Sequence, residues 1–265
     1  VRKLREQSIK TKPHITAERA ILVTEFYKSD AGSQLSTPVR RALALKDLLE
    51  KKKIWIGEGE LIVGERGPAP KEVPTYPEIC CHSLEDLEIL NSRKNTPYAV
   101  DDETKRIYKE EIIPFWKGKS IREIIFNEMS DEWKAAYEAG VFTEFLEQRA
   151  PGHTVLDNKI YKKGLVDFKE DITRKMQNLD FLNDPEAYKK MEQLKAMKIA
   201  ADAVIHYAKR HAEKARELRR NEKNPERRKE LKKIADVCMH VPAHAPRDFW
   251  EALQYYWFIH LGVIT

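Results

Sequence analysis

The chain has 265 residues, a formal net charge of +5, and apolar and charged fractions of 42% and 34%. These proportions are typical of a globular protein and exclude a disordered or fibrous one. No run of about 18 apolar residues is present, so we expect no membrane-spanning helix. The first twelve residues are polar and basic, unlike a signal peptide, and three cysteines are too few for a disulfide framework. We therefore expect a cytoplasmic protein with reduced thiols.

The positive charge is concentrated in residues 209–233, which hold twelve Lys and Arg against five Glu. A nucleic-acid-binding surface usually adds aromatic residues or a known binding motif, and this segment contains no Phe, Trp or Tyr. We interpret the segment as a solvated helical arm and expect no nucleic-acid partner.

Apolar residues at helical spacing, together with N-cap residues, predict a mostly helical chain. Prolines at first helical positions and one capping box support several of these starts. The two longest helices are expected to pack antiparallel at the end of the chain. In chain order, the predicted starts are Thr16, Thr37-Pro38, Ser83-Leu-Glu-Asp86, Ser130, Asp184-Pro185 and Asn224-Pro225.

Extended structure is predicted at two places. Glu60–Glu65 is a short apolar run next to glycines, and Gly152–Asp157 follows a Pro-Gly turn. A proline-rich loop between Gly64 and Pro77 is long enough to indicate a functional or interface role.

The predicted helix Phe249–Leu261 has apolar residues on every face. Such a helix belongs inside a larger core, because no face is left for water. The chain also starts with Val1 rather than Met and continues for only four residues beyond this helix. We therefore expect residues 1–265 to be one truncated domain, the N-terminal part of a longer protein.

The segment Thr143–Thr154 places aromatic, carboxylate, guanidinium and imidazole groups around a Pro-Gly turn. Junctions of this kind often supply the side chains of a ligand pocket. The alternative is structural: surface ion pairing for Arg149, core packing for Phe145 and a hydrogen-bonded turn position for His153.

Cysteine and histidine residues offer two weaker candidates. The pair Cys80-Cys81 suggests redox or nucleophilic chemistry, but adjacent cysteines rarely form a disulfide, and packing explains them. Cys238, His240 and His244 resemble metal ligands, yet Pro242 interrupts the helix that would align them, so no metal site is expected. The sequence has no phosphate-binding loop and no GxGxxG, GxSxG or HExxH motif.

Six short segments, spread over nearly the whole chain, form an ordered set: Glu18–Glu25, Arg41–Lys46, Gly59–Glu65, Pro74–Ile79, Thr143–Thr154 and Tyr256–His260. Together they resemble the glycyl radical enzymes of the pyruvate formate-lyase family, in its dehydratase-like branch near the 4-hydroxyproline and glycerol dehydratases. No single segment is diagnostic, but the ordered set is specific. The versions Pro-Thr-Tyr-Pro-Glu-Ile-Cys-Cys-His and Arg-Ala-Pro-Gly-His-Thr are most similar to the hydroxyproline dehydratase type.

The resemblance implies an α/β fold, in which residues 1–265 form the N-terminal, mostly helical portion of a ten-stranded α/β barrel. It implies an anaerobic enzyme and a homodimer or larger homo-oligomer. A partner, an activating enzyme that uses S-adenosylmethionine and an iron–sulfur cluster, would install the glycyl radical. A cysteine thiyl would then abstract hydrogen from a small hydroxylated substrate.

Neither the radical-bearing glycine motif nor the Cys-x-Glu thiyl motif occurs in the 265 residues. We therefore expect this chain alone to be inert, with no catalytic residue and no bound cofactor or metal. Cys80-Cys81 receives no catalytic role, because the adjacent cysteines of pyruvate formate-lyase proper lie much later in that sequence.

Three substrate-binding candidates follow from the resemblance. Phe145 matches an aromatic residue that packs over the substrate, and His153 matches a histidine that reaches the pocket. Arg149 could hold a substrate carboxylate in a bidentate manner or pair with neighbouring glutamates. The alternatives to a dehydratase are carbon–carbon cleavage of the formate acetyltransferase type and a non-catalytic helical scaffold that docks through residues 209–233.

Overall fold

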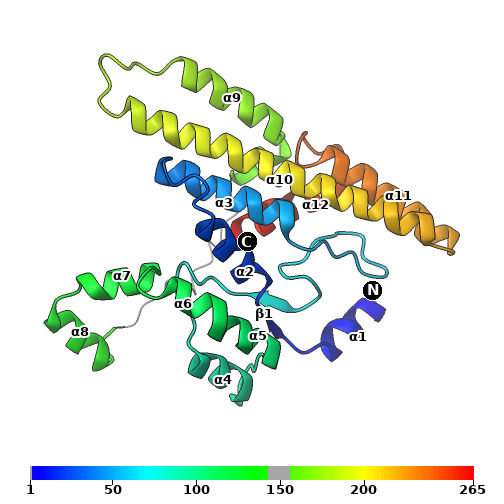
Figure 1. Ribbon diagram of the computed structural model, residues 1–265. Helices are drawn as coiled ribbons and strands as arrows, with labels where there is room; N and C mark the ends of the chain where they lie inside the picture. Colours follow the sequence, from blue (N-terminus) through cyan, green and yellow to red (C-terminus); the bar gives the residue numbers. More distant parts are fainter. Residues whose placement is uncertain (1, 143–155) are drawn as a thin grey trace.

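Helices dominate the computed structural model, which describes residues 2–142 and 156–265. The long helices lie together, and α4 to α8 form a second group of short helices (Figure 1). The long helices are α3 (Thr37–Lys51), α9 (Leu165–Gln177), α10 (Ala187–Asn221), α11 (Pro225–His240) and α12 (Phe249–Ile264). The shorter ones are α1 (Arg2–Lys10), α2 (Glu18–Lys28), α4 (Leu84–Ser92), α5 (Asp102–Ile107), η1 (Tyr108–Ile112), α6 (Ile113–Trp116), α7 (Ile121–Glu128), α8 (Asp131–Glu138) and η2 (Asp157–Tyr161). The prediction of a mostly helical chain is confirmed.

Within the described residues, strands occur only in one two-stranded parallel sheet. β1 (His14–Thr16) pairs with β2 (Glu72–Pro74), and Ile15 lies opposite Val73. The sequence predicts neither strand, because three residues are too few to show alternation.

Three hydrophobic clusters hold the described helices together, the smallest of them between α3 and α10. The larger core lies among α10, α11 and α12, and its fully buried side chains include Tyr207, Tyr255 and Phe258. The second core gathers α2, α5, η1 and α6 around Tyr108 and Trp116. The antiparallel packing of the two longest helices is confirmed, since α10 and α11 form a hairpin (Figure 1). No helix in the described ranges is long and apolar enough to cross a membrane.

The predicted helix starts are right to within three residues. The capping box at Ser83 and the caps at Ser130 and Asn224 are confirmed. The other three starts are displaced: α2 begins at Glu18, after Thr16 has paired in β1, α3 begins at Thr37 with Ser36 as its N-cap, and α10 begins only at Ala187.

The predicted strand Glu60–Glu65 is wrong. The segment runs beside α12 and pairs its backbone with side chains rather than with another strand. These bonds are Trp250 Nε1 to the Leu61 carbonyl (2.9 Å), Gln254 Nε2 to the Val63 carbonyl (2.8 Å), the Val63 amide to Gln254 Oε1 (2.8 Å) and Trp257 Nε1 to the Gly64 carbonyl (2.8 Å). The other predicted strand, Gly152–Asp157, lies mainly outside the described residues, and its last residue begins η2.

The same mode of pairing extends over residues 57–66, called here the α12-bound segment. Arg227 of α11 donates to the carbonyls of Gly57 and Glu60, each at 2.9 Å. Lys52, just after α3, donates to the carbonyls of Glu65 and Arg66 at 3.3 and 2.9 Å. Burying these peptide groups between helices is tolerable because each of them has a hydrogen-bond partner.

The described residues cover only part of α12, although this helix has apolar residues on every face. Tyr255, Phe258 and Leu261 are fully buried, whereas the side chain of Phe249 is 77% exposed and that of Leu253 is 41% exposed. One face therefore lies in the larger core, and part of the other face meets solvent in this structure.

Gly64 is the point of closest approach between the α12-bound segment and α12. Its φ of +119° is rarely adopted by residues with a side chain, and a Cβ there would lie 2.6 Å from Leu261 Cδ1. Glycine is thus required for two independent reasons.

We expect Gly64→Ala to lower the free energy of unfolding by roughly 2 to 4 kcal/mol, from backbone strain and overpacking against Leu261. Chemical denaturation measures the loss. Gly59→Ala is the matched control, because Gly59 also has a positive φ, +77°, but no atom within 4 Å of its added Cβ. Equal losses in the two variants would contradict the close-approach argument.

Candidate functional site

The predicted pocket residues Phe145, Arg149 and His153 lie outside the described residues, so their roles stay predictions. The described chain on the N-terminal side ends at Phe142, whose ring packs edge-on against Trp133 and Tyr137.

The C-terminal flank of the predicted pocket segment is anchored to the larger core. Tyr255 of α12 donates to the Lys163 carbonyl at 3.1 Å, and the amide of Leu165 donates to the Pro242 carbonyl at 2.8 Å. A Cβ on Gly164 would lie 2.2 Å from the Ala243 carbonyl oxygen. The chain that follows the predicted pocket is therefore held by α12 and by the turn between α11 and α12.

Charged side chains gather at the C-terminal end of α12, and we call Arg19, Lys52, Glu65, Tyr76 and Glu78 the α12-end cluster. Lys52 is 3% exposed, and its ammonium group lies 5.3 Å from the centre of the Tyr207 ring. Burial lowers the pKa of Lys52 to about 8. Its two carbonyl acceptors compensate for part of the lost hydration.

Arg19 is the second cation of this cluster. Its Nη1 donates to the Thr75 carbonyl and to Glu78 Oε2, each at 3.0 Å, and its Nε donates to the Thr265 carbonyl. The guanidinium also lies over the Tyr76 ring, 4.1 Å from its centre, and the Tyr76 hydroxyl donates to the Ile264 carbonyl.

Within the described residues, the donors of the α12-end cluster hold backbone at and near the end of α12. Arg19, Lys52 and Tyr76 direct their donors at carbonyl oxygens, and Glu78 accepts from Arg19. Glu65 differs, because burial raises the pKa of its carboxyl to about 7.

His211 is a fully buried imidazole beside the α12-bound segment. Its Nδ1 lies 2.9 Å from the Tyr207 carbonyl, and its Nε2 has no hydrogen-bond partner among the described residues. Its ring meets those of Tyr207 and Phe258 edge-on, at 4.5 and 5.2 Å. Burial lowers the pKa of His211 to about 4, so the ring is neutral at pH 7, with the proton on Nδ1.

We expect His211 to make the protein acid-sensitive. The pKa of His211 is about 4 in the folded chain, below the ordinary value of 6.5 expected in the unfolded chain. Between these two pH values the unfolded chain therefore binds one more proton than the folded chain. The free energy of unfolding falls as the pH drops from 6.5 to 4. His211→Asn keeps a donor for the Tyr207 carbonyl and does not titrate, so its free energy of unfolding should fall less steeply over this window.

Denaturant unfolding measured at several pH values tests this. His206→Asn changes an exposed histidine on the same helix and serves as the control, with a wild-type slope expected. If His211→Asn and wild type lose stability in parallel, His211 does not contribute to the acid sensitivity.

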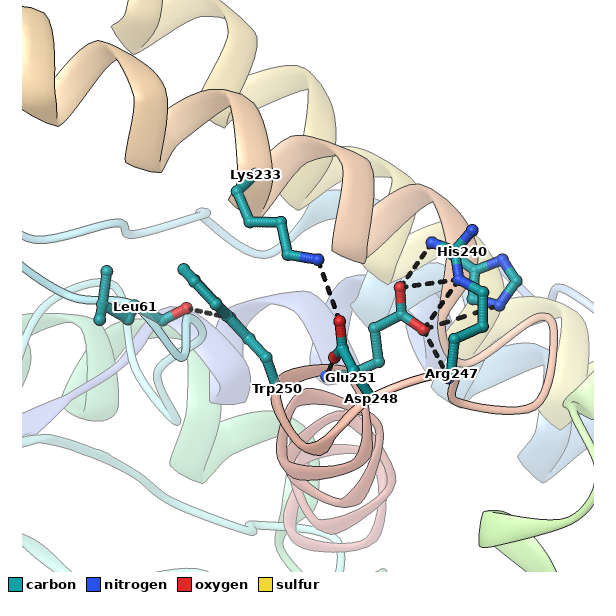
Figure 2. A network of polar contacts seen from close by, with 7 residues as sticks. All are labelled: Leu61, Lys233, His240, Arg247, Asp248, Trp250 and Glu251. Carbon is teal, nitrogen blue, oxygen red and sulfur yellow. Dashed lines mark hydrogen bonds and ion pairs between the residues drawn. The ribbon is translucent and has the colours of Figure 1, made fainter.

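A second polar network fixes the N-terminal end of α12 (Figure 2). Asp248 caps the helix by accepting from the Glu251 amide at 2.8 Å and pairs with Lys233 of α11 at 3.1 Å. The fully buried Glu251 accepts from the Arg247 amide and guanidinium and lies 3.8 Å from His240 Nε2. Burial alone would raise the pKa of Glu251, but the hydrogen bonds from Arg247 lower it.

Among the described cysteines, neither Cys81 nor Cys238 is activated. Burial raises the pKa of the Cys81 thiol to about 12 and also raises that of Cys238, so neither is an activated nucleophile. His240 Nε2 lies 2.9 Å from the Ala245 carbonyl, and the His240 and His244 rings lie 5.2 Å apart. Among residues 2–142 and 156–265, no three His, Cys, Asp or Glu side chains form a potential metal site.

The sequence predicts none of the buried polar residues that fix α12. Lys52, His211 and Glu251 each bond with residues far away in the chain or occupy a position that helical spacing assigns to the core. A charged or imidazole group on an otherwise apolar face, such as His211 beside Ala208 and Ala212, is the one signal that could have identified them.

Residues 1–265 match the Pyruvate formate lyase-like family over the whole chain. The chain therefore belongs to this family.

The trans-4-hydroxy-L-proline dehydratase of Clostridioides difficile is 53% identical over 264 residues, which are 100% of this chain and 33% of the relative. The crystal structure of hydroxyproline dehydratase from Clostridioides difficile, with trans-4-hydroxy-L-proline bound, superposes with a TM-score of 0.92 over 98% of this chain and 33% of that one. The glycerol-bound B12-independent glycerol dehydratase from Clostridium butyricum is 31% identical. It superposes with a TM-score of 0.88 over 99% of this chain and 33% of that one.

These likenesses confirm the resemblance to the dehydratase-like branch and the mostly helical portion of a pyruvate formate-lyase-type fold. The chain spans about a third of the length of the relatives it matches.

Proposed function

We propose that the chain is part of a glycyl radical lyase that dehydrates a small hydroxylated substrate: 4-hydroxyproline, or glycerol or a related diol. The observation that carries the proposal is the 53% identity to a trans-4-hydroxy-L-proline dehydratase over 264 residues, a span that includes Thr143–Thr154. The TM-score of 0.92 to a substrate-bound hydroxyproline dehydratase supports the same activity.

In this proposal the radical chemistry is supplied from outside the 265 residues. The glycyl radical of the whole enzyme, installed by an activating enzyme that uses S-adenosylmethionine and an iron–sulfur cluster, provides hydrogen abstraction. The whole enzyme works in the cytoplasm under anaerobic conditions as a homodimer or larger homo-oligomer.

The contribution of this chain is a substrate-facing wall. Phe145 packs over the substrate and excludes water, which protects a reactive intermediate from side reactions. His153 hydrogen-bonds a substrate hydroxyl and orients it as the leaving group, and Arg149 holds a carboxylate in bidentate geometry. The anchoring of Lys163 and Leu165 to α12 and to the α11–α12 turn supports this role, because a site needs a rigid frame on its flank.

We expect the full-length protein, once activated anaerobically, to dehydrate trans-4-hydroxy-L-proline faster than glycerol or propane-1,2-diol. Mass spectrometry of the products measures the rates, and electron paramagnetic resonance confirms the radical in each reaction. Formate release from pyruvate and coenzyme A would instead identify the carbon–carbon lyase. Absence of both the radical and all turnover would favour the non-catalytic scaffold.

We expect His153→Ala and Phe145→Ala to lower kcat/KM about 100-fold, because each removes a contact that orients the reacting hydroxyl or excludes water. Arg149→Ala should mainly raise KM for a substrate with a carboxylate. The radical signal should persist in all three variants.

His206→Ala, on the exposed face of α10, is the matched control for the imidazole and should retain wild-type rates. Wild-type kinetics in both His153→Ala and Phe145→Ala would return these residues to a structural role. Loss of the radical signal would indicate a folding or activation defect instead.

A further inference from the structure

Four arginines converge on one hollow at the tip of the α10–α11 hairpin. Arg216, Arg219 and Arg220 come from the last turns of α10, and Arg228 comes from the first turn of α11. They line a cavity of about 290 Å³, and all four are exposed. The tip projects away from the other helices (Figure 1). We call these four residues the arginine hollow.

The carboxylates of the hairpin do not neutralise the arginine hollow. In the described residues, four of the five glutamates of residues 209–233 accept from donors outside the hollow, and no ion pair joins the fifth, Glu213, to the hollow. These contacts are Lys214 to Glu217 (2.8 Å), the Asn224 amide to Glu222 (2.8 Å), Lys229 to Glu226 (2.9 Å) and Arg227 to Glu230 (2.8 Å). Four guanidinium groups are therefore left without a carboxylate, although carboxylates are near in the sequence.

Helix stability does not explain this arrangement. Arg219 and Arg220 suit the C-terminal end of α10, where the helix dipole favours positive charge. Arg216 and Arg220 stand four residues apart, a spacing that brings like charges together, and Arg228 lies near the positive end of α11. Bringing four positively charged guanidinium groups together opposes folding. A bound anion would reduce the repulsion between them.

We propose that the arginine hollow binds a compact polyanion that carries two or more phosphate groups. Guanidinium groups stay charged at any physiological pH and present planar pairs of donors that match phosphate oxygens. The cavity lies near the lower end of the volume range of small-molecule sites, which suits a ligand of a few phosphates.

The surroundings favour this ligand class over a protein surface or a nucleic acid. Among the described residues, the hairpin itself has no large exposed hydrophobic side chain between Met197 and Met239, so it offers a protein partner little apolar surface. Residues 209–233 also lack the aromatic rings on which bases stack. Recognition at this place depends on charge and on guanidinium geometry alone.

Isothermal titration of the full-length protein with inorganic tripolyphosphate tests the proposal. We expect saturable binding of one ligand per chain, weakened about tenfold or more in the double variant Arg216→Gln with Arg220→Gln, because two bidentate contacts are lost. The matched control, Lys209→Gln with Lys232→Gln, removes the same charge from exposed positions of the same two helices outside the hollow and should change the affinity less than about twofold.

Three results would overturn the proposal: no saturable binding, equal weakening in the arginine and lysine variants, or tighter binding of a hexaglutamate peptide than of tripolyphosphate. Equally tight binding of single inorganic phosphate would refute the requirement for two or more phosphate groups. Dehydratase turnover is a separate measurement, so this test and that of the proposed function can fail independently.

Discussion

The structure depends on a backbone segment that belongs to no sheet and is buried at Gly57, Val63 and Gly64. Residues 57–66 pass among the long helices, and their peptide groups bond with side chains of Lys52, Arg227, Trp250, Gln254 and Trp257. An unpaired buried peptide group is costly, so displacing any one of these helices would leave several such groups unsatisfied at once. The segment therefore fixes α11 and α12 relative to the end of α3.

α12 transmits this constraint to the predicted pocket. Its N-terminal end is held by the Glu251 network and its C-terminal end by Arg19 and Tyr76. Its buried face holds the Lys163 carbonyl through Tyr255, and Lys163 follows closely after the predicted pocket segment. A helix fixed at both ends can position the flank of a site more accurately than a free loop can.

Signals between neighbouring residues predict much of this fold. The sequence carries no comparable signal for contacts between residues that are far apart in the chain. The capping box at Ser83 and the proline start at Asn224-Pro225 involve neighbouring residues only, and both are confirmed. Glu60–Glu65 has the composition of a strand, but its partners lie almost 190 residues later, on a helix. No local pattern distinguishes a backbone that pairs with strands from one that pairs with side chains. The residue types around the Pro-Gly turn identify Thr143–Thr154 as a pocket candidate, whereas the roles of Phe145, Arg149 and His153 follow from the family resemblance.

The α10–α11 hairpin joins two parts under opposite constraints. Its inner length supplies Tyr207, His211 and Leu231 to the larger core, where substitution costs packing or leaves a polar atom unpaired. Its tip, with Arg216 and Arg228, contacts solvent and is free of that requirement. The basic composition of residues 209–233 suggests a uniform solvated arm, but helical geometry sorts its charges into paired and unpaired sets. A ligand at the tip would reach the core along the hairpin and through Arg227, the neighbour of Arg228, which donates to the Gly57 and Glu60 carbonyls of the α12-bound segment.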